Sequence, residues 1–335
     1  MTDTKGKLAN RIEYIDIAKA FGIFLVILGH AVSSDTLVKN VVYSFHMPLF
    51  FILSGMVIRR KDDYSLKVWI GIVKKKFFAL IIPYIVWGCI YSAFSFKNLF
   101  FIAYGTRETL MYATSLTSLW FLPVMFISGI SAEFVISISK NQKAIPAIAA
   151  VCLFTVASFL PHISKFGYPW GLNVAVMCTA FVLFGYMVKA FIDETINDKA
   201  LLKAAIMLGC LVVFCIGVQY SNSDVGYVLM ANAVYGNPLF FALNALSGSL
   251  AVIFLAHIVC GFKFYKAPLL YAGENTLGIF VVHKPVVEFI RYNLEGFGID
   301  YSFVMAIAVS AITLIISCIA VKIIHCFIPS LLGKR

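Results

Sequence analysis

Apolar stretches long enough to cross a lipid bilayer recur along the whole chain, and they constrain its fold more than any other feature. A transmembrane helix needs about 20 mostly apolar residues. Because the hydrocarbon core offers no water to backbone polar groups, such a chain has to form a bundle of helices. The sequence therefore predicts an all-α integral membrane protein with about ten transmembrane helices. The predicted spans are 14–33, 41–58, 77–96, 117–138, 145–160, 171–190, 201–219, 238–260, 268–290 and 302–325.

The composition agrees with a membrane protein that has one domain. Only 13% of the residues are charged, and the mean hydropathy is +0.92, whereas a soluble domain has roughly 25% charged residues. No appended soluble domain or internal repeat is visible, so residues 1–335 are expected to form a single transmembrane domain. The eight cysteines show no metal-ligand spacing, and no metal is expected.

The positive charges are distributed as a topology signal. A net charge of +11 could indicate a nucleic-acid ligand, but no basic stripe alternates with exposed aromatic residues. With the N-terminus inside, twenty of the 27 lysines and arginines fall on the inner side and five on the outer side. Cytoplasmic loops carry such an excess. Both termini are therefore predicted to be cytoplasmic, with membrane lipid rather than nucleic acid as a partner.

The first predicted span carries ionisable side chains on one helix face. Lys19 and His30 are eleven residues apart, which places them within roughly 20° of each other and about 16 Å apart along the axis. Asp16 precedes Lys19 by three positions on the same side. Ionisable groups in spans usually face a partner or an interior path, so this face is a candidate site. Lys19 either forms a structural ion pair with Asp16 or Glu13, or meets an anionic cofactor.

His30 is the leading candidate for chemistry. A neutral imidazole can take a proton from a hydroxyl and return it to a leaving group. The alternative is a buried histidine that only bonds another helix. Because the turn to the second span is short, the two spans should be antiparallel neighbours, with His46 at a depth similar to that of His30. His46 then either assists His30 or caps its own helix.

The segment between the second and third predicted spans is the most basic part of the chain. It reads RRKDDYSLKVWIGIVKKK, from Arg59 to Lys76. Such a loop can anchor the protein to anionic lipid and set its topology. It can also receive a phosphorylated donor on the cytoplasmic side, because lysine and arginine bind phosphate through charge and hydrogen bonds. The sequence leaves both roles open.

Other polar residues lie near or inside predicted spans. Ser54 and Gly55 are small residues that favour close helix packing. Ser54 as an acyl nucleophile is the alternative, although no base neighbours it in the sequence. Trp120 opens the fourth span, where tryptophan usually belongs to an interfacial belt. His283 and Lys284 lie inside the ninth span beside a proline, which argues for a water-accessible kink.

The predicted outer loop at 219–237 differs from the other loops because it contains no lysine or arginine. It offers Asp224 together with several asparagines and tyrosines. These side chains suit a neutral polar ligand such as a sugar, and they are also ordinary loop residues. Both interpretations stay open.

Four short motifs follow one another in order along nearly the whole chain. They comprise Asp16, Lys19 and His30; then Phe50, Phe51, Ser54 and Gly55; then Trp120, Phe121 and Leu122; and finally Gly273 to His283. In this combination the chain resembles membrane-bound acyltransferase family three, and more narrowly its bacterial O-acetyltransferase, fucose 4-O-acetylase-like branch. One departure is that three lysines precede Pro83-Tyr84, where family members often carry Arg-x-x-Arg. Lysine keeps the charge but loses the bidentate fork.

The resemblance implies an O-acyltransferase, most simply an O-acetyltransferase, in the bacterial cytoplasmic (inner) membrane. It implies acetyl-CoA as the cytoplasmic donor and a carbohydrate hydroxyl as the acceptor, in O-antigen, exopolysaccharide or a lipid-linked sugar. The expected catalytic group is His30, Lys19 and Asp16. The donor is expected to meet Lys19, Arg59, Arg60 and Lys76. The acceptor is expected to meet His46, Ser54, Trp120 and His283.

Two other functions compete with transfer. A transporter or flippase of an acylated or anionic metabolite would use the intramembrane lysine and histidine as a translocation path, but no inverted repeat is visible. A regulatory protein without turnover is the third alternative, and the intact His30 motif argues against it. The sequence does not choose between direct transfer and an acyl-enzyme, and it identifies no oxyanion partner.

Overall fold

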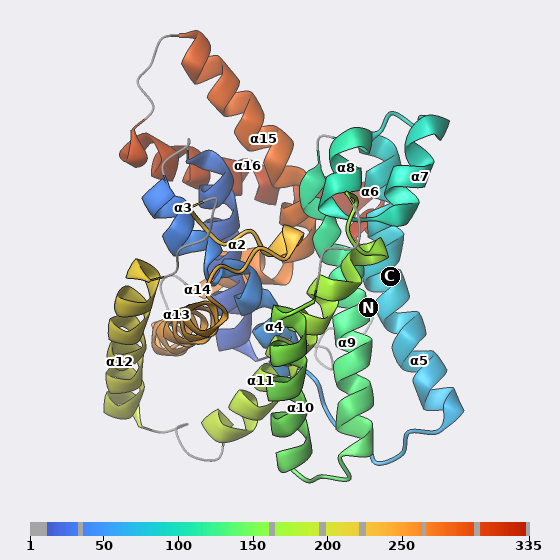
Figure 1. The fold of residues 1–335 in the computed structure, drawn as a ribbon. Coiled ribbons are helices and arrows are strands. Elements are labelled where there is room, and N and C mark those ends of the chain that lie inside the picture. The colour runs from blue at the N-terminus through green and yellow to red at the C-terminus, as the bar shows by residue number, and fades with distance from the viewer. Residues whose placement is uncertain are drawn as a thin grey trace, which may run out of the picture.

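The computed structural model describes residues 12–32, 36–114, 116–160, 165–193, 199–220, 226–262, 266–297 and 302–332, and these are helical almost throughout (Figure 1). An isolated bridge between Leu229 and Val234 is the sole β-type pairing within these ranges. The predicted all-α class is therefore confirmed for the described part of the chain. The first helices are α2 (Glu13–Ala31), α3 (Thr36–Tyr43), α4 (His46–Met56), α5 (Leu66–Lys76), α6 (Ile82–Tyr91), α7 (Phe96–Tyr104) and α8 (Arg107–Ala113).

The remaining helices complete the bundle. They are α9 (Phe121–Ile138), α10 (Ala144–Ser158), α11 (Leu172–Phe191), α12 (Ala200–Gln219), α13 (Pro238–Val259), α14 (Lys266–Glu274), α15 (Thr276–Gly296) and α16 (Phe303–Phe327). Short 3-10 helices include η2 (Thr117–Trp120) and η5 (Met230–Asn232), and a π-helical turn, η1 (Phe77–Ile81), joins α5 to α6.

Seven helical segments of the described chain are long and apolar enough to cross a membrane. They correspond to the first, second, fourth, sixth, seventh, eighth and tenth predicted spans, so the count of ten is not confirmed. The fifth predicted span is α10, which has only 15 residues. The ninth falls on α14 and α15, and α15 carries several charged residues, including Lys284, Glu288 and Arg291. The chain termini lie outside the described residues.

The basic segment before the third predicted span differs from the expected loop. Its second half is the helix α5, which continues through η1 into α6, so the helix begins at Leu66 rather than near residue 77. Lysine is a strong helix former, which explains why a charged sequence can extend a helix beyond its apolar part. Likewise, the interval between the third and fourth predicted spans is largely helical and contains α8 and most of α7.

Helix α2 occupies the centre of the bundle (Figure 1). It contacts α3, α4, α13, α14, α15 and α16. Most of its residues are buried, including Asp16 near its start. On the candidate face of the first span, Asp16 is buried, whereas Lys19 and His30 are partly exposed.

The motif that contains Ser54 and Gly55 lies where α4 crosses α11. A Cβ atom added at Gly55 would lie 1.9 Å from the carbonyl oxygen of Val182. The reciprocal glycine, Gly185, approaches the carbonyl oxygen of Ile52 equally closely. Backbones that meet at this distance leave no room for a side chain, so the prediction that this pair supports close helix packing is confirmed for Gly55.

Candidate active site

Two cavities lie next to each other beside α2 and α4. The large cavity has a volume of about 750 Å³, and its lining includes Lys19 of α2 and Ser54 of α4. The small cavity has a volume of about 260 Å³, and its lining includes His30 of α2 and His46 of α4. Helices α2 and α4 thus contribute to both cavities. Lys19 lines the large cavity, whereas His30 and His46 line the small one.

The large cavity is basic at its polar positions and otherwise mostly apolar. Its charged lining consists of Lys19, Arg59, Lys61, Lys75, Lys76, Glu133 and Glu274. A third cavity, of about 490 Å³, adjoins it and shares Lys19 and Arg59. Of the residues expected to meet the donor, Lys19, Arg59 and Lys76 therefore come together, whereas Arg60 is exposed and lines neither the large nor the small cavity.

The small cavity collects the histidines, aromatic rings and cations. Trp120 of η2 lines it and is only 7% exposed, so this side chain is enclosed by protein. His46 is 5% exposed, and its Nδ1 donates to the carbonyl oxygen of Val42 at 2.7 Å. Since a carbonyl can only accept, Nδ1 of His46 carries the proton and its Nε2 is an acceptor. The expected proximity of His30 and His46 is matched by their place in one cavity.

A thin wall separates the two cavities. Met47 and Phe280 line both of them. The ring of Phe280 packs against Phe121, with a centroid distance of 5.4 Å, and against His283, with a centroid distance of 5.8 Å. Material that passes from one cavity to the other must therefore move past a thioether and an aromatic ring.

His283 of α15 lies behind His30 rather than in a cavity. Their ring centroids are 5.3 Å apart and the planes are tilted by 45°. Nδ1 of His283 donates to the carbonyl oxygen of Phe280 at 2.7 Å, which leaves Nε2 as an acceptor. His283 is fully buried, and its Nε2 has no hydrogen-bond partner within the described residues. The orphaned acceptor thus lies on a ring that contacts His30.

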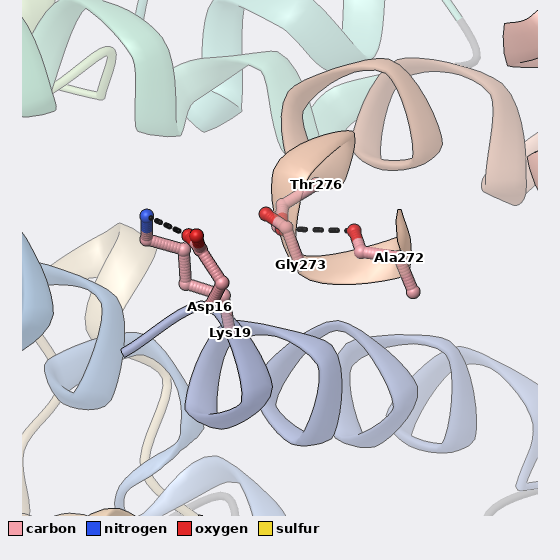
Figure 2. Close-up of polar contacts among 5 residues, drawn as sticks. All are labelled: Asp16, Lys19, Ala272, Gly273 and Thr276. Atoms are coloured by element: carbon pink, nitrogen blue, oxygen red, sulfur yellow. Dashed lines mark hydrogen bonds and ion pairs between the residues drawn. The ribbon is translucent and has the colours of Figure 1, made fainter. Parts of the chain in front are cut away.

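The start of α2 meets the last motif of the chain. Lys19 Nζ lies 3.0 Å from Asp16 Oδ1, as Figure 2 shows, while Glu13 pairs with Lys266 instead. A Cβ at Gly273 would lie 1.9 Å from the carbonyl oxygen of Asp16, so α14 and α2 touch through their backbones. Thr276, shown in the same figure, closes the adjoining turn by donating to the carbonyl oxygens of Gly273 and Ala272. The first and last motifs, which are far apart in the sequence, therefore contact each other in the fold.

Ser54 lines the large cavity, away from the histidines that line the small one. Its hydroxyl donates to the carbonyl oxygen of Phe51 at 2.7 Å. No histidine appears among the described residues that line the large cavity. Among the described residues, the ionisable side chains that line the cavity of Ser54 are therefore lysines, an arginine and two glutamates.

Sequence reasoning missed Lys39, Tyr43 and Arg107, which line the small cavity together with the histidines. Lys284 of the ninth predicted span and Tyr227 of the 219–237 segment, both noted in the sequence, line it as well. Arg107 donates to Asn232 Oδ1 at 3.2 Å, and this bond ties α8 to the 219–237 segment that supplies Tyr227. Of the polar residues predicted in that segment, Asn222 and Asp224 lie outside the described residues. The charges of Lys39 and Arg107 had been visible only as loop charges, because nothing in the sequence brings them together.

The described residues contain no group of three or more His, Cys, Asp or Glu side chains that could hold a metal ion. They place His30, the candidate base, in the small cavity, which adjoins the large basic cavity at Met47 and Phe280. This arrangement suits the transfer of a group between two substrates that bind in adjoining cavities.

Comparison with known proteins identifies the family. A model of an acyltransferase domain matches residues 12–322, which is most of the chain. The nodulation protein NolL of Sinorhizobium fredii (strain NBRC 101917 / NGR234) is 21% identical over 300 residues, covering 83% of this chain and 78% of that protein. The family expected from the four motifs is thus confirmed. The chain belongs to acyltransferase family three and is a multi-pass membrane acyltransferase.

Proposed function

We propose that this protein is an O-acetyltransferase that moves an acetyl group from acetyl-CoA in the large cavity to a carbohydrate hydroxyl in the small cavity. The observation that carries the proposal is the shared wall of Met47 and Phe280, with a basic, largely apolar cavity on one side and His30 on the other. Each substrate would have a separate place, and the two places adjoin at Met47 and Phe280.

The large cavity suits the chemistry of coenzyme A. Its cations, among them Arg59, Lys75 and Lys76, can bind phosphate groups through charge-assisted hydrogen bonds. Its apolar lining, which includes Leu53, suits the pantetheine arm. Its volume lies within the range of about 300–1,000 Å³ that is usual for small-molecule sites. The basic face would lie on the cytoplasmic side, where CoA is available.

His30 is the proposed general base. It takes the proton of the acceptor hydroxyl as that oxygen attacks the thioester carbonyl carbon. The C–S bond then breaks, and His30 returns the proton to the departing sulfur, which leaves as the free CoA thiol. The products are an acetyl ester and CoA, and no other reactant is needed. Asp16 and Lys19 lie far from His30 along α2 and would act on the donor.

His283 is proposed as a positioning residue. With Nε2 as an acceptor, it can hold an N–H of His30, which would leave the other ring nitrogen of His30 free to face the acceptor. Direct transfer is proposed because His30 lines the small cavity, where the acceptor hydroxyl would bind.

The test is release of CoA thiol by the purified protein, combined with mass spectrometry of glycans from cells. We expect acetyl-CoA and an acceptor extract to yield free thiol, and glycans to gain one acetyl mass only when the gene and His30 are intact. His325→Ala is the matched control, because His325 is exposed and lines neither cavity. A transporter would release no thiol. Equal acetylation by His30→Ala, at equal protein levels, would remove the proposed mechanism.

A further inference from the structure

The small cavity carries three cations from three separate elements. Lys39 comes from α3, Arg107 from the first residue of α8 and Lys284 from α15. The described residues that line this cavity include no aspartate or glutamate. In the large cavity, by contrast, Glu133 and Glu274 accompany the basic residues. Lys39, Arg107 and Lys284 thus make the described lining of the small cavity positive.

Each of these cations contacts a neutral group. Lys284 Nζ donates to Thr117 Oγ1 at 3.2 Å. Arg107 donates to the amide oxygen of Asn232 at 3.2 Å. Lys39 Nζ lies over the ring of Tyr227, 5.7 Å from its centroid. A hydroxyl, an amide and an aromatic face can orient a cation without cancelling its charge.

Two carboxylates lie near these cations but outside the cavity lining. Glu288 Oε1 is 3.6 Å from Lys284 Nζ and offsets part of that charge, but the Glu288 side chain is 54% exposed, whereas that of Lys284 is 14% exposed. Glu108 accepts a hydrogen bond from Asn232, one side chain beyond Arg107. Neither carboxylate lines the small cavity, so a ligand there would face the cations directly.

Three like charges around about 260 Å³ repel each other, and the repulsion is strong where water is scarce. A neutral sugar would leave this repulsion in place, whereas an anion would relieve it. Arginine and lysine are also the side chains that bind carboxylate and phosphate most effectively. The volume is just below the usual range for small-molecule sites, which fits a single sugar unit rather than an oligosaccharide.

The geometry points to an acidic acceptor: an anionic group on the sugar unit binds Lys39, Arg107 and Lys284, and this contact presents a hydroxyl to His30. The inference rests on the proposed function and adds the chemical class of its acceptor. The anion is either a carboxylate of the sugar or a phosphate that links the sugar to a carrier, and the same three cations serve both.

The experiment uses the full-length protein in detergent, acetyl-CoA and the glycan fraction that becomes acetylated in cells. One portion has its carboxylates reduced to alcohols, a second has its phosphates removed enzymatically, and a third is left untreated. We expect one treatment to lower acetyl transfer at least tenfold, and its identity names the source of the anion. Equal transfer to all three portions would overturn the inference while the transferase stands. No transfer to the untreated portion would refute the proposed function itself.

Charge substitutions provide the matching test on the protein. Lys39→Gln, Arg107→Gln and Lys284→Gln should each raise the KM for the acceptor about tenfold or more, while the KM for acetyl-CoA stays within a factor of three. Arg107→Lys, which keeps the charge, should recover part of the loss. Lys97→Gln is the control, because Lys97 of α7 is exposed and lines neither cavity. Unchanged acceptor KM in all three charge variants would contradict the inference even if acetylation is normal.

Discussion

The two cavities share helices and a wall, yet they differ in how their charges are arranged. The large cavity mixes five basic residues with two glutamates and has a broad apolar surface. The small cavity has three cations, two histidines and no carboxylate among its described lining residues. The first arrangement suits a long amphipathic ligand that is bound at several points. The second suits a compact polar ligand that is oriented for reaction.

The largest expected effect comes from the small cavity. His30→Gln should lower the rate of acetyl transfer by about 10²–10⁴, the usual contribution of a general base. Binding of acetyl-CoA should be nearly unchanged, because His30 does not line the large cavity. Thiol release and calorimetric CoA titration separate the two effects. If the transfer rate and the affinity for acetyl-CoA fall together, the assignment of the donor and the acceptor to separate cavities is wrong.

The next effect concerns the wall of the large cavity. Gly273→Ala should lower the stability of the protein by about 1–3 kcal/mol, because its Cβ would overlap the backbone of Asp16 and push α14 away from α2. The measurement is thermal unfolding in detergent. Gly209→Ala is the control, since a Cβ at Gly209 meets no atom within 4 Å. Equal melting temperatures for the two variants would contradict the close contact.

A smaller effect distinguishes two adjacent arginines. Arg59→Gln should raise the KM for acetyl-CoA about tenfold, which corresponds to the loss of one hydrogen bond to a charged group. Arg60→Gln should leave it unchanged, because Arg60 is exposed and does not line the large cavity. Steady-state kinetics at saturating acceptor measure both values. Similar losses in the two variants would assign the effect to general surface charge instead.

The smallest expected effect tests whether Phe280 keeps water in the small cavity away from the thioester. Phe280→Leu should raise acetyl-CoA hydrolysis in the absence of acceptor a few-fold relative to transfer, because a smaller side chain admits water to the thioester. Leucine keeps the position apolar and limits the loss of packing. Thiol release with and without acceptor gives the ratio. A ratio equal to that of the unaltered protein would mean that Phe280 does not exclude water.

Much of the bundle could be predicted from sequence because apolar length is a local property. The spans that contain α2, α9, α13 and α16 follow directly from runs of apolar residues. The helix α5 could not be predicted in this way, since its lysines resemble a loop in hydropathy although they favour helix. Similarly, α15 carries charged residues that lower its hydropathy below that of an apolar span, and several of them, such as Glu288, are exposed.

The sequence could predict which site residues share one helix, but it could not predict which residues from different helices come together. The spacing of Lys19 and His30 indicated one functional face, and both residues do line cavities. The 219–237 segment suggested a neutral ligand because it lacks basic residues. The cations that surround its Tyr227 come from α3, α8 and α15, and the sequence does not state which helices are neighbours.

The wall between the cavities is built into the same backbone as the histidines. Met47 directly follows His46, and the carbonyl oxygen of Phe280 accepts a hydrogen bond from His283 Nδ1. A movement that parts Met47 from Phe280 would therefore also shift the rings of His46 and His283. Delivery of the thioester and alignment of the base would then occur as one event. This order of events would protect acetyl-CoA. The thioester would meet the acceptor oxygen only after Met47 and Phe280 have parted and His30 has been aligned.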